Sequence, residues 1–217
     1  MSYFRPPGSR DNHIVLANTN DLVHIRIADL LRIVANMTQY RHSLLSLQND
    51  SIRLLRLKPD KDKSADIHCE LFEYSLQECS RSHLYEALSY VWGGSQKNLH
   101  VFIRSCSFGV TDNLHAALLQ LRNPTLERIL WVDAICIDQT NQKEKEHQIQ
   151  MMAMVYGQAN RVIVWLGEAA ECSEQALTQI LVARGDMFTH PPSNDTIGKQ
   201  VIALLQRPWF RRVWVSC

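Results

Sequence analysis

The sequence lacks the cysteine and histidine patterns of several common protein classes. Its six cysteines form no Cys-x-x-Cys pair and are spaced irregularly, which argues against a small disulfide-rich scaffold and favours reduced thiols. Cys136 lies in an apolar run and is expected to be a buried, unreactive thiol. No His-Glu-x-x-His pattern occurs, so no metal site is predicted. The glycine-rich loops that bind nucleotide phosphates are absent too, and no cofactor is predicted.

Long apolar runs and an excess of charge are also missing. The formal net charge is +1, which leaves no electrostatic footprint for nucleic acid or for an anionic membrane. No run approaches the roughly 18 apolar residues that a membrane-spanning helix needs. Residues 1–10 contain no apolar segment of the kind found in signal peptides. These absences predict a cytoplasmic protein that binds neither nucleic acid nor membrane.

What is present is an ordinary globular balance, with 46% apolar and 21% charged residues. The pattern along the chain divides it into three sections: residues 1–50, 51–84 and 85–217. The first section is expected to be an extension that is partly helical, because its apolar positions between 21 and 48 suit one or two amphipathic helices. The second is expected to be a lead-in, with strands at 52–57 and 67–75 on either side of a charged loop.

The third section alternates strand and helix patterns. Apolar runs predict strands at residues 87–92, 129–137 and 161–166, and continuous runs of this kind are typical of strands covered on both faces. Asn141, with Glu144 three residues later, predicts the start of a helix that spans residues 142–158. The remaining predicted elements are a hairpin over 99–110, a helix capped near Thr111 and two helices over 173–185 and 196–205. The alternation predicts an α/β fold with a mostly parallel sheet and flanking helices.

One face of the predicted helix 142–158 carries the apolar side chains Ile149, Met152, Val155 and Tyr156. Their spacing of three and four residues places them on the same side of the helix. We therefore expect Met152 and Val155 to be buried against the sheet. A carboxylate introduced at Met152 is expected to unfold the domain, because an unpaired buried charge is costly.

Three blocks carry a resemblance to a known family. The first is YEALSYVWGG at residues 85–94, the second extends over residues 130–169 and begins LWVDAICIDQ, and the third is RPWFRRVWV at residues 207–215. In their chemistry and separation these blocks resemble the heterokaryon-incompatibility (HET) domain of filamentous fungi. The resemblance implies a role in fungal nonself recognition, in which fusion of incompatible hyphae triggers cell death. HET domains have also been likened to Toll/interleukin-receptor (TIR) domains, which implies a fold like that of TIR domains and flavodoxins.

Some TIR domains cleave NAD with a glutamate, and the resemblance directs attention to the end of the third block. In the family this block usually continues as Trp-Val-x-Gln-Glu, whereas here it reads Trp214-Val215-Ser216-Cys217 and ends. On this pattern the domain is expected to be incomplete at its C-terminus and to lack that glutamate. No catalytic residue is therefore assigned, and NAD cleavage by this chain is not expected.

Five residues are candidates for a binding site: Tyr90, Trp92, Gly93, Asp133 and Asp138. Tyr90 and Trp92 lie where a strand gives way to a glycine-containing loop. Asp133 interrupts an apolar run near a strand end, and ligands of open parallel sheets gather beyond such ends. The alternative is structural: the aromatic rings pack in the core, and the two aspartates accept hydrogen bonds that organise loops.

Two functions of different kinds therefore stay open. One is a signalling and interaction module that works through self-association or a protein partner. The other is an NAD-cleaving enzyme of the TIR type, which depends on analogy of fold. An inactive fragment of a longer HET protein is a third possibility.

Overall fold

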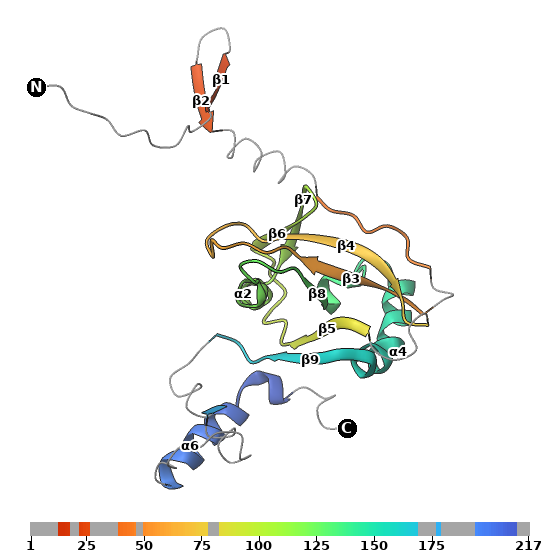
Figure 1. The fold of residues 1–217 in the computed structure, drawn as a ribbon, viewed down its shortest axis with the longest axis vertical. Coiled ribbons are helices and arrows are strands. Elements are labelled where there is room, and N and C mark those ends of the chain that lie inside the picture. The colour runs from red at the N-terminus through yellow and green to blue at the C-terminus, as the bar shows by residue number, and fades with distance from the viewer. Residues whose placement is uncertain are drawn as a thin grey trace, which may run out of the picture.

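The computed structural model describes residues 13–17, 22–26, 39–46, 50–77, 83–168, 177–178 and 194–211. The centre of the fold is a seven-stranded sheet with the strand order β7-β6-β4-β3-β8-β5-β9 (Figure 1). Its strands are β3 (Ser51–Leu57), β4 (His68–Ser75), β5 (His83–Tyr90), β6 (Leu99–Ile103), β7 (Cys106–Val110), β8 (Arg128–Trp131) and β9 (Ala159–Trp165). The helices are α2 (Asp112–Leu121), α3 (Asp133–Cys136), α4 (Gln142–Gln158), α6 (Asn194–Leu205) and the 3₁₀ helix η1 (Pro208–Arg211).

The α/β class predicted from the sequence is confirmed, but the sheet is mixed rather than mostly parallel. Parallel pairs join β4 to β6, β5 to β8 and β5 to β9. Antiparallel pairs join β3 to β4, β3 to β8 and β6 to β7. Two of these antiparallel pairs follow from the length of their connections: two residues join β6 to β7, and the connection from β3 to β4 is also shorter than the dozen or more residues that a parallel crossover needs.

The three predicted parallel strands do lie together, with β5 between β8 and β9. The predicted strand over residues 129–137 was nevertheless too long. The strand β8 ends at Trp131, and the chain turns at once into the short helix α3, where the Cys136 amide donates to the Val132 carbonyl at 2.7 Å. Apolar periodicity does not separate a buried strand from a buried helical turn, so this boundary was not visible in the sequence.

The predicted helical N-terminal segment is also corrected. Strands β1 (His13–Ala17) and β2 (Leu22–Arg26) form an antiparallel pair, so residues 22–26 are not helical. Valine and isoleucine, which favour strands, occur in both segments and outweigh a spacing that also suits a helix. Residues 39–46 form no helix either, and the rest of the 27–48 segment lies outside the described residues. The predicted helix over 173–185 is described only at 177–178, which are helical.

The strand β3 runs through the middle of the core. Its side chains Ile52, Leu54, Leu55 and Leu57 are all at most 2% exposed. It is hydrogen-bonded on one side to β4 and on the other to β8. The section 51–84, expected from the sequence to be a lead-in, therefore supplies two interior strands, β3 and β4, of the same sheet that holds β5, β8 and β9.

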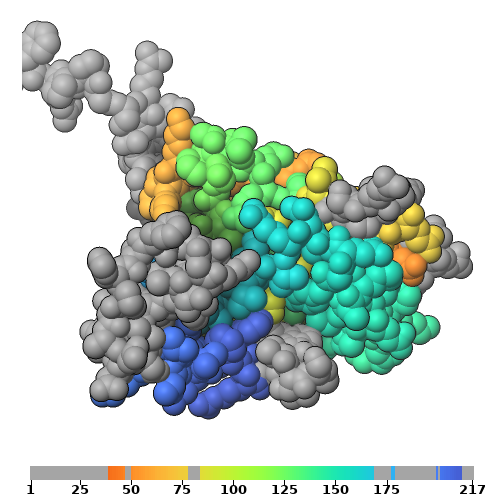
Figure 2. Space-filling view, turned by 60° about the horizontal axis from the view of Figure 1, so that its bottom comes forward, coloured from red at the N-terminus to blue at the C-terminus, as the bar shows by residue number. Residues whose placement is uncertain are grey.

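Helix α4 starts as predicted but buries a different face. Asn141 Oδ1 accepts a hydrogen bond from the Glu144 amide at 3.2 Å, which caps the helix. The buried side chains are Glu144, Gln148, Met151 and Val155. Val155 was predicted to be buried and is, but Met152 is only half-buried and Ile149 is 51% exposed. The surface of α4 lies beside that of β9, with α6 next to β9 (Figure 2).

Because α4 buries Val155 and leaves Met152 half-buried, a carboxylate introduced at each position is expected to change the stability of the domain differently. Val155→Asp is expected to unfold the domain, because burying an unpaired carboxylate costs several kcal/mol, about the scale of a whole domain's stability. Met152→Asp is expected to leave the domain folded, since its side chain lines an open cavity. Urea unfolding followed by circular dichroism compares the two variants with the wild type. Equal destabilisation by both would show that the helix packs on a different face.

Within the described part of the chain, no helix is long and apolar enough to cross a membrane.

Candidate functional site

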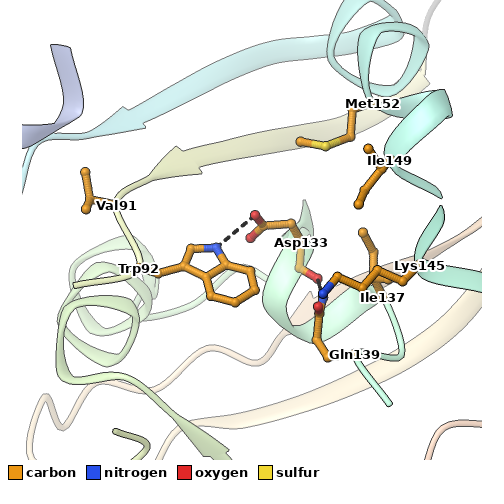
Figure 3. A pocket seen from close by; sticks show the side chains of 8 residues that line it. All are labelled: Val91, Trp92, Asp133, Ile137, Gln139, Lys145, Ile149 and Met152. Atoms are coloured by element: carbon orange, nitrogen blue, oxygen red, sulfur yellow. Dashed lines mark hydrogen bonds between the residues drawn. The ribbon is translucent and has the colours of Figure 1, made fainter. Parts of the chain in front are cut away.

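A cavity of about 400 Å³ lies beyond the carboxyl ends of β5 and β8 (Figure 3). Its wall on one side is the loop that follows β5, and on the other side it is the first half of α4. The short helix α3 and the loop after it complete the lining. The lining residues are Val91, Trp92, Asp133, Ile137, Gln139, Lys145, Ile149 and Met152. Ligands of open parallel sheets bind beyond strand ends of this kind, and β5 and β8 are a parallel pair, so the cavity is a candidate binding site.

Trp92 and Asp133 are the polar centre of this cavity. The indole Nε1 of Trp92 donates to Asp133 Oδ2 at 3.0 Å, and the Ala134 amide donates to Asp133 Oδ1 at 2.7 Å. Asp133 is 7% exposed, whereas Trp92 is 40% exposed and presents part of its ring to the cavity. The carboxylate is therefore held between two donors, which fixes the ring of Trp92 relative to α3.

Asn113 of α2 fixes the loop after β5 from the other side. Its Nδ2 donates to the Val91 carbonyl at 2.6 Å, and its Oδ1 accepts from the indole of Trp165 at 2.8 Å. Gly93 has a φ of +76°, and a Cβ at this position would lie 3.1 Å from the Asn113 Cβ. A glycine is thus required both by the backbone conformation and by the close approach of Asn113. No sequence pattern had singled out Asn113.

The opposite wall comes from α4 and from the loop before it. Lys145, Ile149 and Met152 follow one another at spacings of four and three residues, so they line one side of the helix. Gln139 Nε2 donates to the Asp133 carbonyl at 3.0 Å and ties the loop to α3. Lys145, Ile149 and Met152 were not candidates in the sequence, because a lysine and two apolar residues on a helix usually mean a solvated face beside a packed one.

The five sequence candidates separate into two groups. Trp92 and Asp133 line the cavity and are hydrogen-bonded to each other, and Gly93 follows directly after. Tyr90 is 1% exposed and belongs to the hydrophobic core. Asp138 is turned away: its Oδ1 accepts from the amide and the hydroxyl of Thr140 at 2.9 and 2.7 Å. Partial burial opposes ionisation of Asp138, but these hydrogen bonds outweigh it and hold the pKa of the carboxyl group below its usual value.

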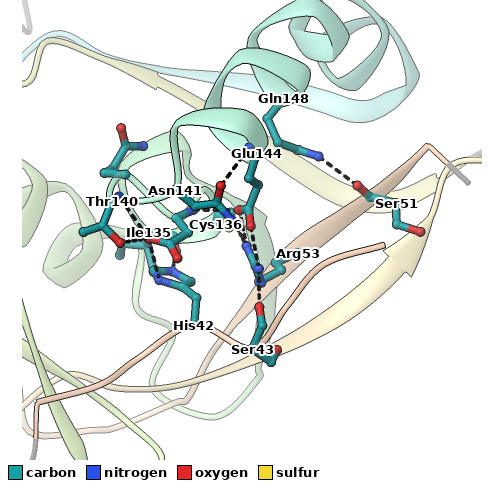
Figure 4. A network of polar contacts seen from close by, with 12 residues as sticks. His42, Ser43, Ser51, Arg53, Ile135, Cys136, Thr140, Asn141, Glu144 and Gln148 are labelled. Atoms are coloured by element: carbon teal, nitrogen blue, oxygen red, sulfur yellow. Dashed lines mark hydrogen bonds and ion pairs between the residues drawn. The ribbon is translucent and has the colours of Figure 1, made fainter. Parts of the chain in front are cut away.

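A buried ion pair behind the cavity joins α4 to β3 (Figure 4). Arg53 Nη2 donates to Glu144 Oε2 at 3.0 Å, and the Asp138 amide donates to Glu144 Oε1 at 2.8 Å. Arg53 also donates to the carbonyls of Cys136 and Ser43. The sequence predicted a capping role for Glu144, but its carboxylate binds Arg53, which is 91 residues away in the chain.

Cys136 is buried, as expected, although it lies in a helix rather than a strand. Burial raises the pKa of its thiol to about 12, so the thiol is protonated at neutral pH and a poor nucleophile. Among the described residues, no three His, Cys, Asp or Glu side chains gather as a group that could hold a metal ion.

The third sequence block meets the other two at the same sheet. Trp209 Nε1 donates to Ser89 Oγ of β5 at 3.0 Å. Arg207 Nη1 donates to the carbonyls of Leu166 and Glu168, just after β9, at 3.0 and 3.2 Å. The blocks that resemble one family in sequence are therefore joined by hydrogen bonds in the structure.

Comparison with known proteins agrees with this arrangement. Heterokaryon incompatibility protein 6, OR allele, of Neurospora crassa is 31% identical over 155 residues, which cover 65% of this chain and 22% of that protein. The chain thus spans about a fifth of the length of this relative. No solved structure matches the chain. The model of the family described as Heterokaryon incompatibility protein (HET) matches residues 85–216, more than half of the chain, and the chain therefore belongs to this family.

Proposed function

We propose that this chain takes part in heterokaryon incompatibility as a signalling and interaction module, with the cavity at Trp92 as its binding site. The family and the Neurospora relative support the biological process. The module reports recognition through self-association or through contact with a protein partner. The apolar side chains of Val162 and Val164 on β9, which are 46% and 39% exposed, suit such a contact.

The observation that supports a binding role is that the carboxylate of the cavity, Asp133, is hydrogen-bonded to the protein. Asp133 accepts hydrogen bonds from Trp92 and from the Ala134 amide, so its oxygens are engaged in holding the cavity's shape. The neighbouring carboxylate, Glu144, is 2% exposed and paired with Arg53. A general base must reach its substrate, and both of these carboxylates are instead tied into the fold. A preformed cavity with fixed polar groups is typical of a ligand site.

Removal of the Trp92 ring is expected to abolish most of the biological response. Trp92→Ala deletes the main aromatic wall and leaves Asp133 with one donor fewer, which costs about 1–3 kcal/mol of stability. The chain and the variant are expressed from an inducible promoter in Neurospora crassa, and hyphal death is scored by uptake of a vital dye. The wild type is expected to kill and Trp92→Ala to kill far less at equal abundance. Leu126→Ala, at a position 67% exposed and outside the cavity lining, is the matched control.

Two results would count against the proposal. Absence of any response to the wild-type chain would remove the incompatibility role, and undiminished killing by Trp92→Ala would remove the cavity from it. The enzymatic alternative has its own readout: release of nicotinamide when the purified chain is incubated with NAD. Robust release would favour the TIR-like activity over the binding module.

A further inference from the structure

The cavity at Trp92 is apolar over most of its wall and carries few polar groups. Val91, Ile137, Ile149 and Met152 line it with aliphatic or thioether groups, and Trp92 adds part of its ring. Among the described lining residues, Asp133, Gln139 and Lys145 bring polar or charged side chains, and Trp92 adds its indole N–H. A volume of about 400 Å³ is within the range of small-molecule sites.

Two of the three polar side chains are already bound to the protein. The Asp133 carboxylate accepts from Trp92 and from the Ala134 amide, and Gln139 donates to the Asp133 carbonyl. Lys145 differs. Among the described residues, its ammonium group takes part in no salt bridge and no side-chain hydrogen bond, although the side chain is half-buried in the cavity wall. Of the two charged side chains that line the cavity, Asp133 is hydrogen-bonded to the protein, and Lys145 is the one left with donors for a ligand in this part of the chain.

The geometry points to an amphipathic anion as the ligand of this cavity. Its apolar ring or short chain lies against Trp92, Ile149 and Met152, and its single carboxylate, sulfonate or phosphate group pairs with Lys145. A hydrogen bond between two charged groups is about twice as strong as a neutral one, and apolar surroundings strengthen it further. The hydrogen bonds from Trp92 and Ala134 hold Asp133 in place, so the anionic group is directed to the α4 side. This inference depends on the proposed function only in taking the cavity as a binding site.

A pair of fluorescent dyes separates the contribution of the ligand's charge to binding from that of its apolar rings. One is 8-anilinonaphthalene-1-sulfonate, and the other is N-phenyl-1-naphthylamine, which has the same rings without the sulfonate. Both are titrated into the full chain. The sulfonate dye is expected to bind at one site. Lys145→Gln is expected to lower its affinity about tenfold, because a hydrogen bond to a charged group contributes a free energy of that size. Binding of the neutral dye is expected to change little.

Lys143→Gln is the matched control, because Lys143 is exposed on the same helix and does not line the cavity. This variant is expected to bind both dyes as tightly as the wild type. Met152→Asp is expected to lower the affinity for the sulfonate dye more than the affinity for the neutral dye. Urea midpoints of all variants must equal that of the wild type, which excludes dye binding to partly unfolded chains. The assignment would be overturned if Lys145→Gln lowered the affinity for both dyes equally or left both affinities unchanged. It would also be overturned if the sulfonate dye did not bind at one site. These outcomes are independent of hyphal death, so the inference and the proposed function fail separately.

Discussion

A chain that begins at Tyr85, where the family match starts, is expected not to fold. It lacks β3 and β4, and β3 lies between β4 and β8 in the sheet. The lost side chains include Ile52, Leu54 and Leu55, each at most 2% exposed. Each such side chain contributes about 1.5–3 kcal/mol on burial. Their combined loss is comparable with the whole stability of a domain, about 5–15 kcal/mol.

The matched control is a chain that begins at Gln39. It keeps β3, β4 and the segment 39–46, whose Tyr40 amide donates to the Ser107 carbonyl at 2.9 Å and whose Ser43 carbonyl accepts from Arg53. Thermal unfolding followed by circular dichroism is expected to show one cooperative transition for this chain, and none for the chain that begins at Tyr85. A cooperative transition at the same temperature in both would show that β3 and β4 are dispensable to the fold.

Local patterns were sufficient to predict most individual elements. The strands at 51–57 and 68–75, the hairpin after residue 99 and the helix over 142–158 all lie where composition and caps predicted them. In each case the signal is contained in a few neighbouring residues: alternating apolar and polar side chains, a turn or an N-terminal cap. The capping residues Thr111 and Asn141 accept from the amides three residues later, as their sequence contexts predicted.

Long-range pairing was not visible in the same way. The place of β3 between β4 and β8, and the mixture of parallel and antiparallel neighbours, depend on contacts between distant segments. The buried face of α4 was misassigned because Glu144 and Gln148 look solvent-facing in sequence. They are buried because Arg53 and the Ser51 carbonyl, both on β3, provide their partners.

In the candidate site, too, some residues could be predicted from local sequence and others could not. Trp92 and Asp133 were candidates because each stands near a strand end, and the structure brings them within hydrogen-bond distance. Lys145 and Met152 reach the cavity only because α4 forms the wall opposite Trp92 (Figure 3). Nothing in their own sequence neighbourhood distinguishes them from any other lysine and methionine on an amphipathic helix.

Glu144→Ala is expected to destabilise the domain by about 3–5 kcal/mol, because it leaves a buried charge without its partner. Arg53 is 1% exposed, and Glu144 supplies its counter-ion. The carbonyls of Ser43 and Cys136 would remain as acceptors, but they carry no net charge. Urea unfolding measures the loss, with Glu146→Ala as the control: Glu146 is exposed on the same helix, and surface changes of this kind usually stay within about 0.5 kcal/mol.

The loss in Glu144→Ala has two possible reasons: the unpaired charge left on Arg53, and the loss of stabilisation by the ion pair itself. A double variant separates them. Arg53→Met combined with Glu144→Leu removes both charges and keeps apolar volume between β3 and α4. Replacement of a whole buried ion pair by apolar groups is often close to neutral, so the double variant is expected to be more stable than Glu144→Ala. If the double variant is as unstable as the single one, the ion pair and its hydrogen bonds stabilise the fold directly. If instead Glu144→Ala costs less than about 1 kcal/mol, the site is accessible to water and Arg53 is not a buried charge.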